Sequence, residues 1–155
     1  MIPAKQFDTI NEGTKILEKL KIKYPEIGNI EDLISSYSDS MNGDELSQYI
    51  CSLSINLVRI NDVAAQFISN SNESYTYRKF AQLWEFNALS NKMAVKEREQ
   101  IALDNSFEFY KMELLNKYIA DVIKAKIDSV NRLISSIQTR LRFMRSEQNN
   151  SNTQT

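Results

Sequence analysis

The chain has 155 residues, enough for about one domain, and its 42% hydrophobic and 25% charged content is ordinary for a globular protein. The net charge is −1, so the chain as a whole has no electrostatic preference for nucleic acid or for a membrane surface. The absence of histidine and the presence of one cysteine, Cys51, exclude an internal disulfide, the commonest general base and most zinc ligand sets.

The sequence predicts neither a secretory signal nor a membrane span. The opening MIPAKQFDTI lacks an apolar core, and no stretch approaches the ~18 apolar residues that a spanning helix needs. We therefore expect a soluble protein of the cytoplasm, or of the host cytoplasm if the protein is viral, with no membrane partner.

Charge is distributed unevenly along the chain. Residues 1–75 carry 6 basic and 11 acidic side chains, whereas residues 76–155 carry 13 basic and 9 acidic ones. A chain polarised in this way can attract its own copies head to tail, or an anion at one end only.

The first predicted unit is an acidic N-terminal segment, residues 1–43, with short helices. We expect one helix over 8–22 and a second that begins after Asn29 as its N-cap, followed by a turn over 39–45. Gly13 lies inside the first helix, where glycine costs about 1 kcal/mol relative to alanine.

A long-helix domain, residues 44–147, follows and contains neither glycine nor proline, the residues that strand-and-turn folds need at their corners. Helices are expected from Asp44 to the polar break NSNES at 70–74, from there to about residue 89, and from about Leu103 onward. Residues 148–155, QNNSNTQT, are expected to be disordered. The fold class is therefore all-α, with long antiparallel helices forming a bundle.

The last helix is amphipathic, and its apolar residues fall within about a third of a helical wheel. This stripe must be buried, either in the chain's own core or between subunits, and its length favours a homo-oligomer. The predicted interface residues are Ile123, Val130, Leu133, Ile134, Ile137, Leu141 and Met144. Lys126 projects onto the apolar side, so it must extend to solvent or pair with an acid.

Residues for enzymatic chemistry are missing from the sequence. There is no glycine-rich phosphate loop, and Cys51 lies beside an apolar helix face, where a buried structural thiol is expected. The pair Asp104 and Glu108 has helical spacing but is typical of a solvated surface. We expect no enzyme activity, no cofactor and no metal site.

Basic and aromatic residues gather in the second half of the chain, where arginine suits phosphate because its planar fork donates two parallel hydrogen bonds. The candidate nucleic-acid-binding residues are Arg78, Lys79, Lys124, Arg132, Arg140, Arg142 and Arg145, with Tyr75 and Tyr77 as base-stacking candidates. The alternative is that these charges are only the solvated edge of a core helix. Phe80 and Trp84 are spaced i, i+4 and are expected in the core.

The segment KIDSVNRLISSIQTRLRFMRSE, residues 126–147, ends an all-helical chain in an amphipathic basic helix. Over residues 45–147 this layout resembles the UvsY-type recombination mediators of tailed phages, and the segment looks like the C-terminal assembly helix of that family. The resemblance implies single-stranded DNA binding by the basic residues, a ring-like homo-oligomer held by the final helix, and assistance in loading a recombinase.

Two functions follow from these patterns. The first is a single-stranded-DNA-binding accessory protein of phage recombination or repair, with a recombinase or a single-strand-binding protein as a further partner. The second is a non-enzymatic helical structural or adaptor protein, active in phage assembly or as a protein–protein interaction module. Both use an oligomer, and only the ligand separates them.

Overall fold

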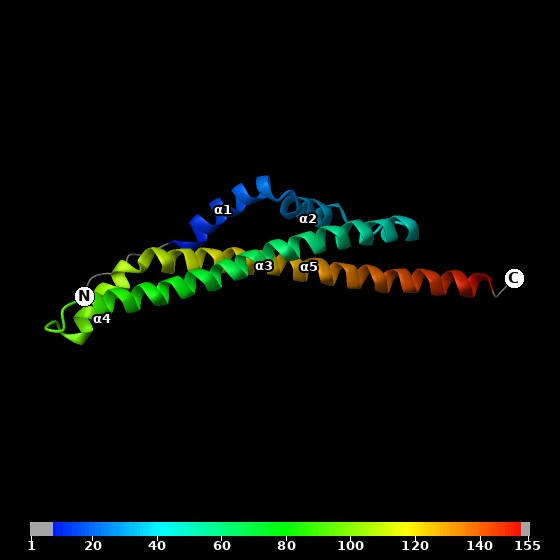
Figure 1. Cartoon of the computed structure of the whole chain (residues 1–155). Coiled ribbons are helices and arrows are strands. Elements are labelled where there is room, and N and C mark those ends of the chain that lie inside the picture. The colour runs from blue at the N-terminus through cyan, green and yellow to red at the C-terminus, as the bar shows by residue number, and fades with distance from the viewer. Residues whose placement is uncertain (1–7, 153–155) are drawn as a thin grey trace. The chain divides into compact units, whose positions relative to one another are not determined.

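The computed structural model describes residues 8–152, with side chains through Glu147, and this range is helical without a strand. The helices are α1 (Thr9–Lys23), α2 (Pro25–Ser36), α3 (Gly43–Ala88), α4 (Val95–Asn105) and α5 (Phe107–Asn152) (Figure 1). The all-α fold class is confirmed. Within the described range, no helix combines the length and the apolar character that crossing a membrane requires.

The helices contribute to two compact units. Unit 1 contains the described part of Met1–Glu18 together with Ala64–Asp121, and unit 2 contains Lys19–Val63 together with the described part of Val122–Thr155. The boundaries fall within α1, α3 and α5, so the division does not coincide with the boundary that the sequence suggested after residue 43.

Unit 2 has a continuous apolar core from three helices. Its members recur at helical spacing and are Ile27 and Ile30 of α2, Leu46, Tyr49, Leu53, Ile60 and Val63 of α3, and Ile123, Ile127, Val130 and Ile137 of α5. The predicted apolar faces of α3 and α5 therefore pack within one chain. Because α2 supplies two fully buried isoleucines, the part of the acidic N-terminal segment that forms α2 contributes to this core.

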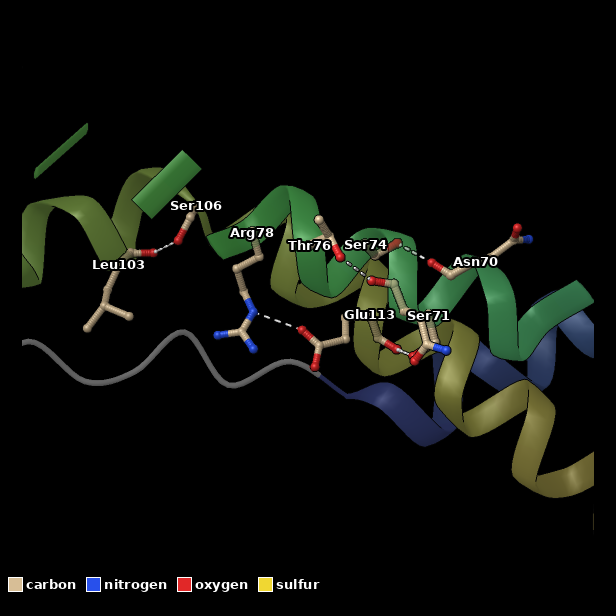
Figure 2. A network of polar contacts seen from close by, with 9 residues as sticks. Asn70, Ser71, Ser74, Thr76, Arg78, Leu103, Ser106 and Glu113 are labelled. Carbon is tan, nitrogen blue, oxygen red and sulfur yellow. Dashed lines mark hydrogen bonds and ion pairs between the residues drawn. The ribbon is translucent and has the colours of Figure 1, made fainter. Parts of the chain in front are cut away.

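In unit 1, α3 and α5 run antiparallel. The Ser71 hydroxyl of α3 donates to the Glu113 backbone carbonyl of α5 (Figure 2). Six residues further along α3, the Tyr77 ring lies 6.2 Å from the ring of Phe109, which comes earlier in α5. The chain reverses through α4, whose buried Arg98 donates to the Phe86 carbonyl in the last turn of α3. A cation at a helix C-terminus is stabilised by the helix dipole.

The predicted helix break at 70–74 was wrong, because α3 continues through it. The hydroxyls of Ser74 and Thr76 donate to the carbonyls of Asn70 and Asn72, one turn earlier, so the polar side chains are satisfied without leaving the helix (Figure 2). Neither glycine nor proline interrupts the segment, and the helix ends only at Ala88.

Three predicted helix boundaries also need correction. α2 begins at Pro25, which lacks an amide hydrogen and suits the first turn of a helix, so Asn29 lies inside α2 and is not its N-cap. Helix α5 begins at Phe107, after the buried Ser106, and continues to Asn152. Disorder was expected from residue 148, but each residue through 152 adds a helical hydrogen bond; residues 153–155 lie outside the described range.

Gly13 permits the close packing of α1 on α5 in unit 1. A Cβ atom added at Gly13 would lie 2.2 Å from Cδ1 and 2.6 Å from Cε1 of Tyr118. Glycine is therefore retained inside α1 at a cost to helix propensity, because its missing side chain makes room for the Tyr118 ring. Gly28 of α2 differs, since a Cβ there would meet no heavy atom within 4 Å.

We predict opposite effects of alanine at these two glycines. Gly13→Ala should lower the free energy of unfolding by about 1 kcal/mol or more, because overpacking costs about 1–3 kcal/mol and outweighs the gain in helix propensity. Gly28→Ala, the control, should raise it by about 0.5–1 kcal/mol. Urea unfolding followed by circular dichroism measures both, and equal effects would contradict the proposed packing.

Candidate functional site

Four basic side chains of α5 lie exposed in unit 2 and define its basic face. They are Lys124, Arg132, Arg142 and Arg145. The residues between them on this side are small and polar: the hydroxyls of Ser135 and Thr139 donate to carbonyls of their own helix. Because the rise is 1.5 Å per residue, the basic face extends over about 32 Å of helix. Asp128 is the exposed acid within it.

Arg140 does not belong to the basic face. Its guanidinium donates to the hydroxyl of Tyr37 at 3.3 Å and to three backbone carbonyls, those of Ser38 at 3.4 Å, Asp39 at 2.5 Å and Met41 at 2.9 Å. These acceptors lie in the connection between α2 and α3. We therefore correct its predicted role: Arg140 holds this connection against α5, because both of its terminal amino groups are engaged within the chain.

Arg78 is engaged in the same way in unit 1. Its Nε donates to Glu113 at 2.8 Å (Figure 2). Both side chains are less than one-fifth exposed. The guanidinium carbon also lies 5.2 Å from the ring centroids of Tyr75 and Tyr110. A cation paired with a carboxylate in a half-buried position does not attract phosphate, so Arg78 is removed from the candidate surface.

Lys79, Tyr75 and Tyr77 are exposed but lie in unit 1, whereas the basic face lies in unit 2. The Lys79 ammonium is 5.7 Å from the Tyr75 ring, and Tyr77 packs against Phe109. The sequence ranges of unit 1 contain nine basic and eleven acidic residues, a poor setting for phosphate. These three residues therefore belong to unit 1, and the exposed arginines of α5 belong to unit 2.

The predicted intersubunit stripe of α5 contributes to the core of its own chain. Ile123, Val130 and Ile137 are 0% exposed, so they cannot contact another copy while the fold is intact. The remaining members, Leu133, Ile134, Leu141 and Met144, are half-buried. The assignment of the first three to an oligomer interface is corrected, because α2 and α3 supply enough apolar surface to cover them.

Phe143 was missed as a candidate although its position carries a signal. It lies between Arg142 and Arg145 in sequence, outside the apolar third of the helix, and is 68% exposed. An exposed ring beside arginines combines the two groups with which proteins hold single-stranded nucleic acid, a stacking surface and phosphate-binding cations.

A second missed feature is the aromatic face of α3 in unit 1, which we define as Tyr77, Phe80, Leu83 and Trp84. Phe80 is 66% and Trp84 is 76% exposed, so the expectation that both lie in the core was wrong. The opposite side of α3 packs on α5 and carries Ser71, Ser74 and Arg78. The periodicity of the sequence identified an apolar face here, but it could not show whether other parts of the chain cover that face.

The remaining chemistry-bearing residues do not form a site. Cys51 is a free, exposed thiol, which corrects the expectation that it is buried. Arg98 is 8% exposed and its guanidinium carbon lies 4.0 Å from the Phe86 ring centroid, so it acts within unit 1. Among the residues from 8 to 152, no three His, Cys, Asp or Glu side chains are grouped so that they could hold a metal ion.

Glu31 of α2 lies between two lysines in unit 2. Its carboxylate accepts a hydrogen bond from Lys126 of α5 and forms an ion pair with Lys21 of α1 at 3.0 Å. The expectation that Lys126 extends to solvent or pairs with an acid is thereby resolved in favour of the pair. Lys126, followed by Lys21, holds the pKa of the Glu31 carboxyl below its ordinary value of 4.5, although burial acts in the opposite direction.

We predict that Arg140 stabilises the fold and that Arg142 does not. Arg140→Ala should lower the free energy of unfolding by about 1–3 kcal/mol, because it leaves backbone carbonyls between α2 and α3 without donors. Arg142→Ala should change it by less than about 0.5 kcal/mol, because its side chain is exposed. Urea titration of the two variants measures the difference in the free energy of unfolding. Equal stabilities would disprove the role of Arg140 in holding the α2–α3 connection against α5.

A pH dependence follows from Glu31. Because its pKa is lower in the folded chain, its contribution to stability is complete above the ordinary pKa of 4.5 and is lost as the pH falls through the folded pKa. Glu31→Gln should therefore reduce the difference in melting temperature between pH 7 and pH 3. Asp32→Asn, at the exposed neighbouring position, is the control and should keep the wild-type difference.

Comparisons of the chain with protein-family models, with curated proteins and with solved structures each find no match. The resemblance of residues 45–147 to UvsY-type mediators therefore stays a prediction.

Proposed function

We propose that the chain is a non-enzymatic accessory protein that binds single-stranded nucleic acid along the basic face of α5. The observation that carries the proposal is the exposure of Arg142, Phe143 and Arg145 within one turn of helix. Lys124 and Arg132 are exposed earlier in α5. Cations of this kind neutralise phosphates and release counterions, which supplies affinity without reading sequence.

Phe143 gives the basic face its preference for single strands. A base can stack on an exposed ring only when it is not paired and stacked within a duplex, and such stacking contributes about 1–3 kcal/mol per base. Arg142 directly precedes the ring in α5 and is also exposed, so a phosphate next to a stacked base has a cation within reach. This combination favours single-stranded DNA or RNA over a duplex.

The intrachain contacts refine the surface that the sequence suggested. Arg140, Arg78 and Lys126 hold the fold together through the connection between α2 and α3, through Glu113 and through Glu31. The proposed contact residues are therefore Lys124, Arg132, Arg142, Phe143 and Arg145. A role in recombination, with a recombinase or a single-strand-binding protein as partner, follows from the resemblance and is part of the proposal.

A second candidate function is that of a helical structural or adaptor protein. The aromatic face of unit 1 favours it, because large apolar patches on a protein surface mark sites of protein–protein contact. This function makes no use of the basic face. The two candidates are separable because their surfaces belong to different units.

We predict salt-dependent binding of a fluorescein-labelled oligodeoxythymidylate of about 20 nucleotides, measured by fluorescence anisotropy. If four cations neutralise four phosphates, the affinity should fall about 50-fold between about 50 and 200 mM salt. Replacing Arg132, Arg142 and Arg145 together with alanine should reduce this dependence to about threefold. Phe143→Leu should weaken binding at both salt concentrations, whereas Phe143→Tyr should preserve it.

The matched control removes three exposed lysines of unit 1, Lys15, Lys92 and Lys96, and so changes the net charge equally. It should leave the salt dependence at the wild-type value if the basic face is the binding surface. A control that weakens binding as much as the arginine variant would show that only net charge matters. Absence of binding at low salt would eliminate this function and leave the adaptor role.

A further inference from the structure

The aromatic face of α3 is large enough for a specific contact. Tyr77 is 52%, Phe80 66%, Leu83 58% and Trp84 76% exposed. Because aromatic side chains have about 150–250 Å² each to bury, these fractions correspond to roughly 500 Å² of open, mostly apolar surface. A stable interface needs about 800 Å² on each partner, which polar residues at the margin of the face can complete.

The order of residues along α3 fits a second, antiparallel copy of the same helix. A two-fold axis between residues 80 and 81 would place Tyr77 of one copy opposite Trp84 of the other, and Phe80 beside its own equivalent. A two-fold interface requires this kind of self-complementarity, in which residue i meets j and j meets i. Each large ring then faces another ring, an arrangement that adds to the burial of area.

Charge does not oppose this pairing. Glu73 lies on the exposed side of α3 before the aromatic face, and Ala88 is at its other end. In the antiparallel arrangement each Glu73 faces the partner's Ala88, and the two glutamates are about 22 Å apart, well beyond the Debye length in physiological salt. Lys79 is drawn toward the Tyr75 ring, to the side of the face. No charged side chain lies among the four residues that define the face.

We propose that the aromatic face pairs with the aromatic face of a second copy of this chain, so that the protein is a dimer held by α3 of unit 1. The sequence also predicted a homo-oligomer, but it assigned assembly to α5, so the surface proposed here is a different one. The pairing gives the second candidate function a specific partner, and it requires nothing from nucleic acid.

Sedimentation equilibrium of the full chain, without nucleic acid, tests the pairing. The wild type should be a dimer at about 50 µM, and Phe80→Lys should raise the dissociation constant at least about 30-fold, the effect of losing a central interface residue. Val58→Lys is the matched control, because Val58 is also 66% exposed on α3 but belongs to unit 2. It should leave the dimer intact.

Trp84 provides a second readout because it is the sole tryptophan. Its emission should shift to shorter wavelength as the wild type dimerises, and should stay at the wavelength of a solvated indole in Phe80→Lys. A wild type that remains monomeric at this concentration overturns the pairing but leaves the nucleic-acid measurement unaffected. A dimer that survives Phe80→Lys, or that Val58→Lys abolishes, also overturns it, because the interface then lies elsewhere.

The orientation is tested by cross-linking in a Cys51→Ser background, which removes the native thiol. A chain with Glu73→Cys should form a disulfide with a chain that carries Ala88→Cys, and neither should cross-link efficiently to itself. Cross-links of Glu73→Cys to itself would show a parallel pair and contradict the two-fold arrangement. These substitutions lie beyond the four residues of the aromatic face, so they leave its rings in place.

Discussion

Burial of the apolar stripe of α5 is the constraint on which the structure of unit 2 depends. Ile123, Val130 and Ile137 are fully buried at intervals of seven residues, so the same side of α5 faces the core through four turns. Each such side chain contributes roughly 1.5–3 kcal/mol when it leaves water. Since one side of α5 faces α2 and α3, the opposite side must face solvent, and the basic face is the consequence.

The polar residues at the margins of this stripe connect α5 to parts of the chain far away in sequence. Lys126 reaches Glu31, and Arg140 reaches the carbonyls that follow α2, about one hundred residues earlier. These contacts include the acidic N-terminal segment in the fold. They also explain why the basic residues of α5 divide into two classes, those neutralised or engaged within the chain and those open to a ligand.

The two proposed surfaces have different chemistry and belong to different units. The basic face of unit 2 offers cations and one ring, which suit a flexible polyanion with exposed bases. The aromatic face of unit 1 offers rings without charge, which suit another apolar surface. A net charge close to zero is compatible with both, because local arrangement and not total charge determines what each face can bind.

The amino-acid sequence by itself determined the helical fold class and the apolar spacing of α3 and α5. It also determined that Lys126 projects onto the apolar side of its helix and must extend to solvent or pair with an acid. These features follow from the sequence because backbone hydrogen bonding and side-chain periodicity are local properties. Only the tertiary structure decided that Arg140 is engaged while Arg142 is open, that the stripe of α5 is covered by its own chain, and that Phe80 and Trp84 are not covered. Whether a side chain is buried or paired depends on residues up to a hundred positions away, and helical periodicity carries no information about them.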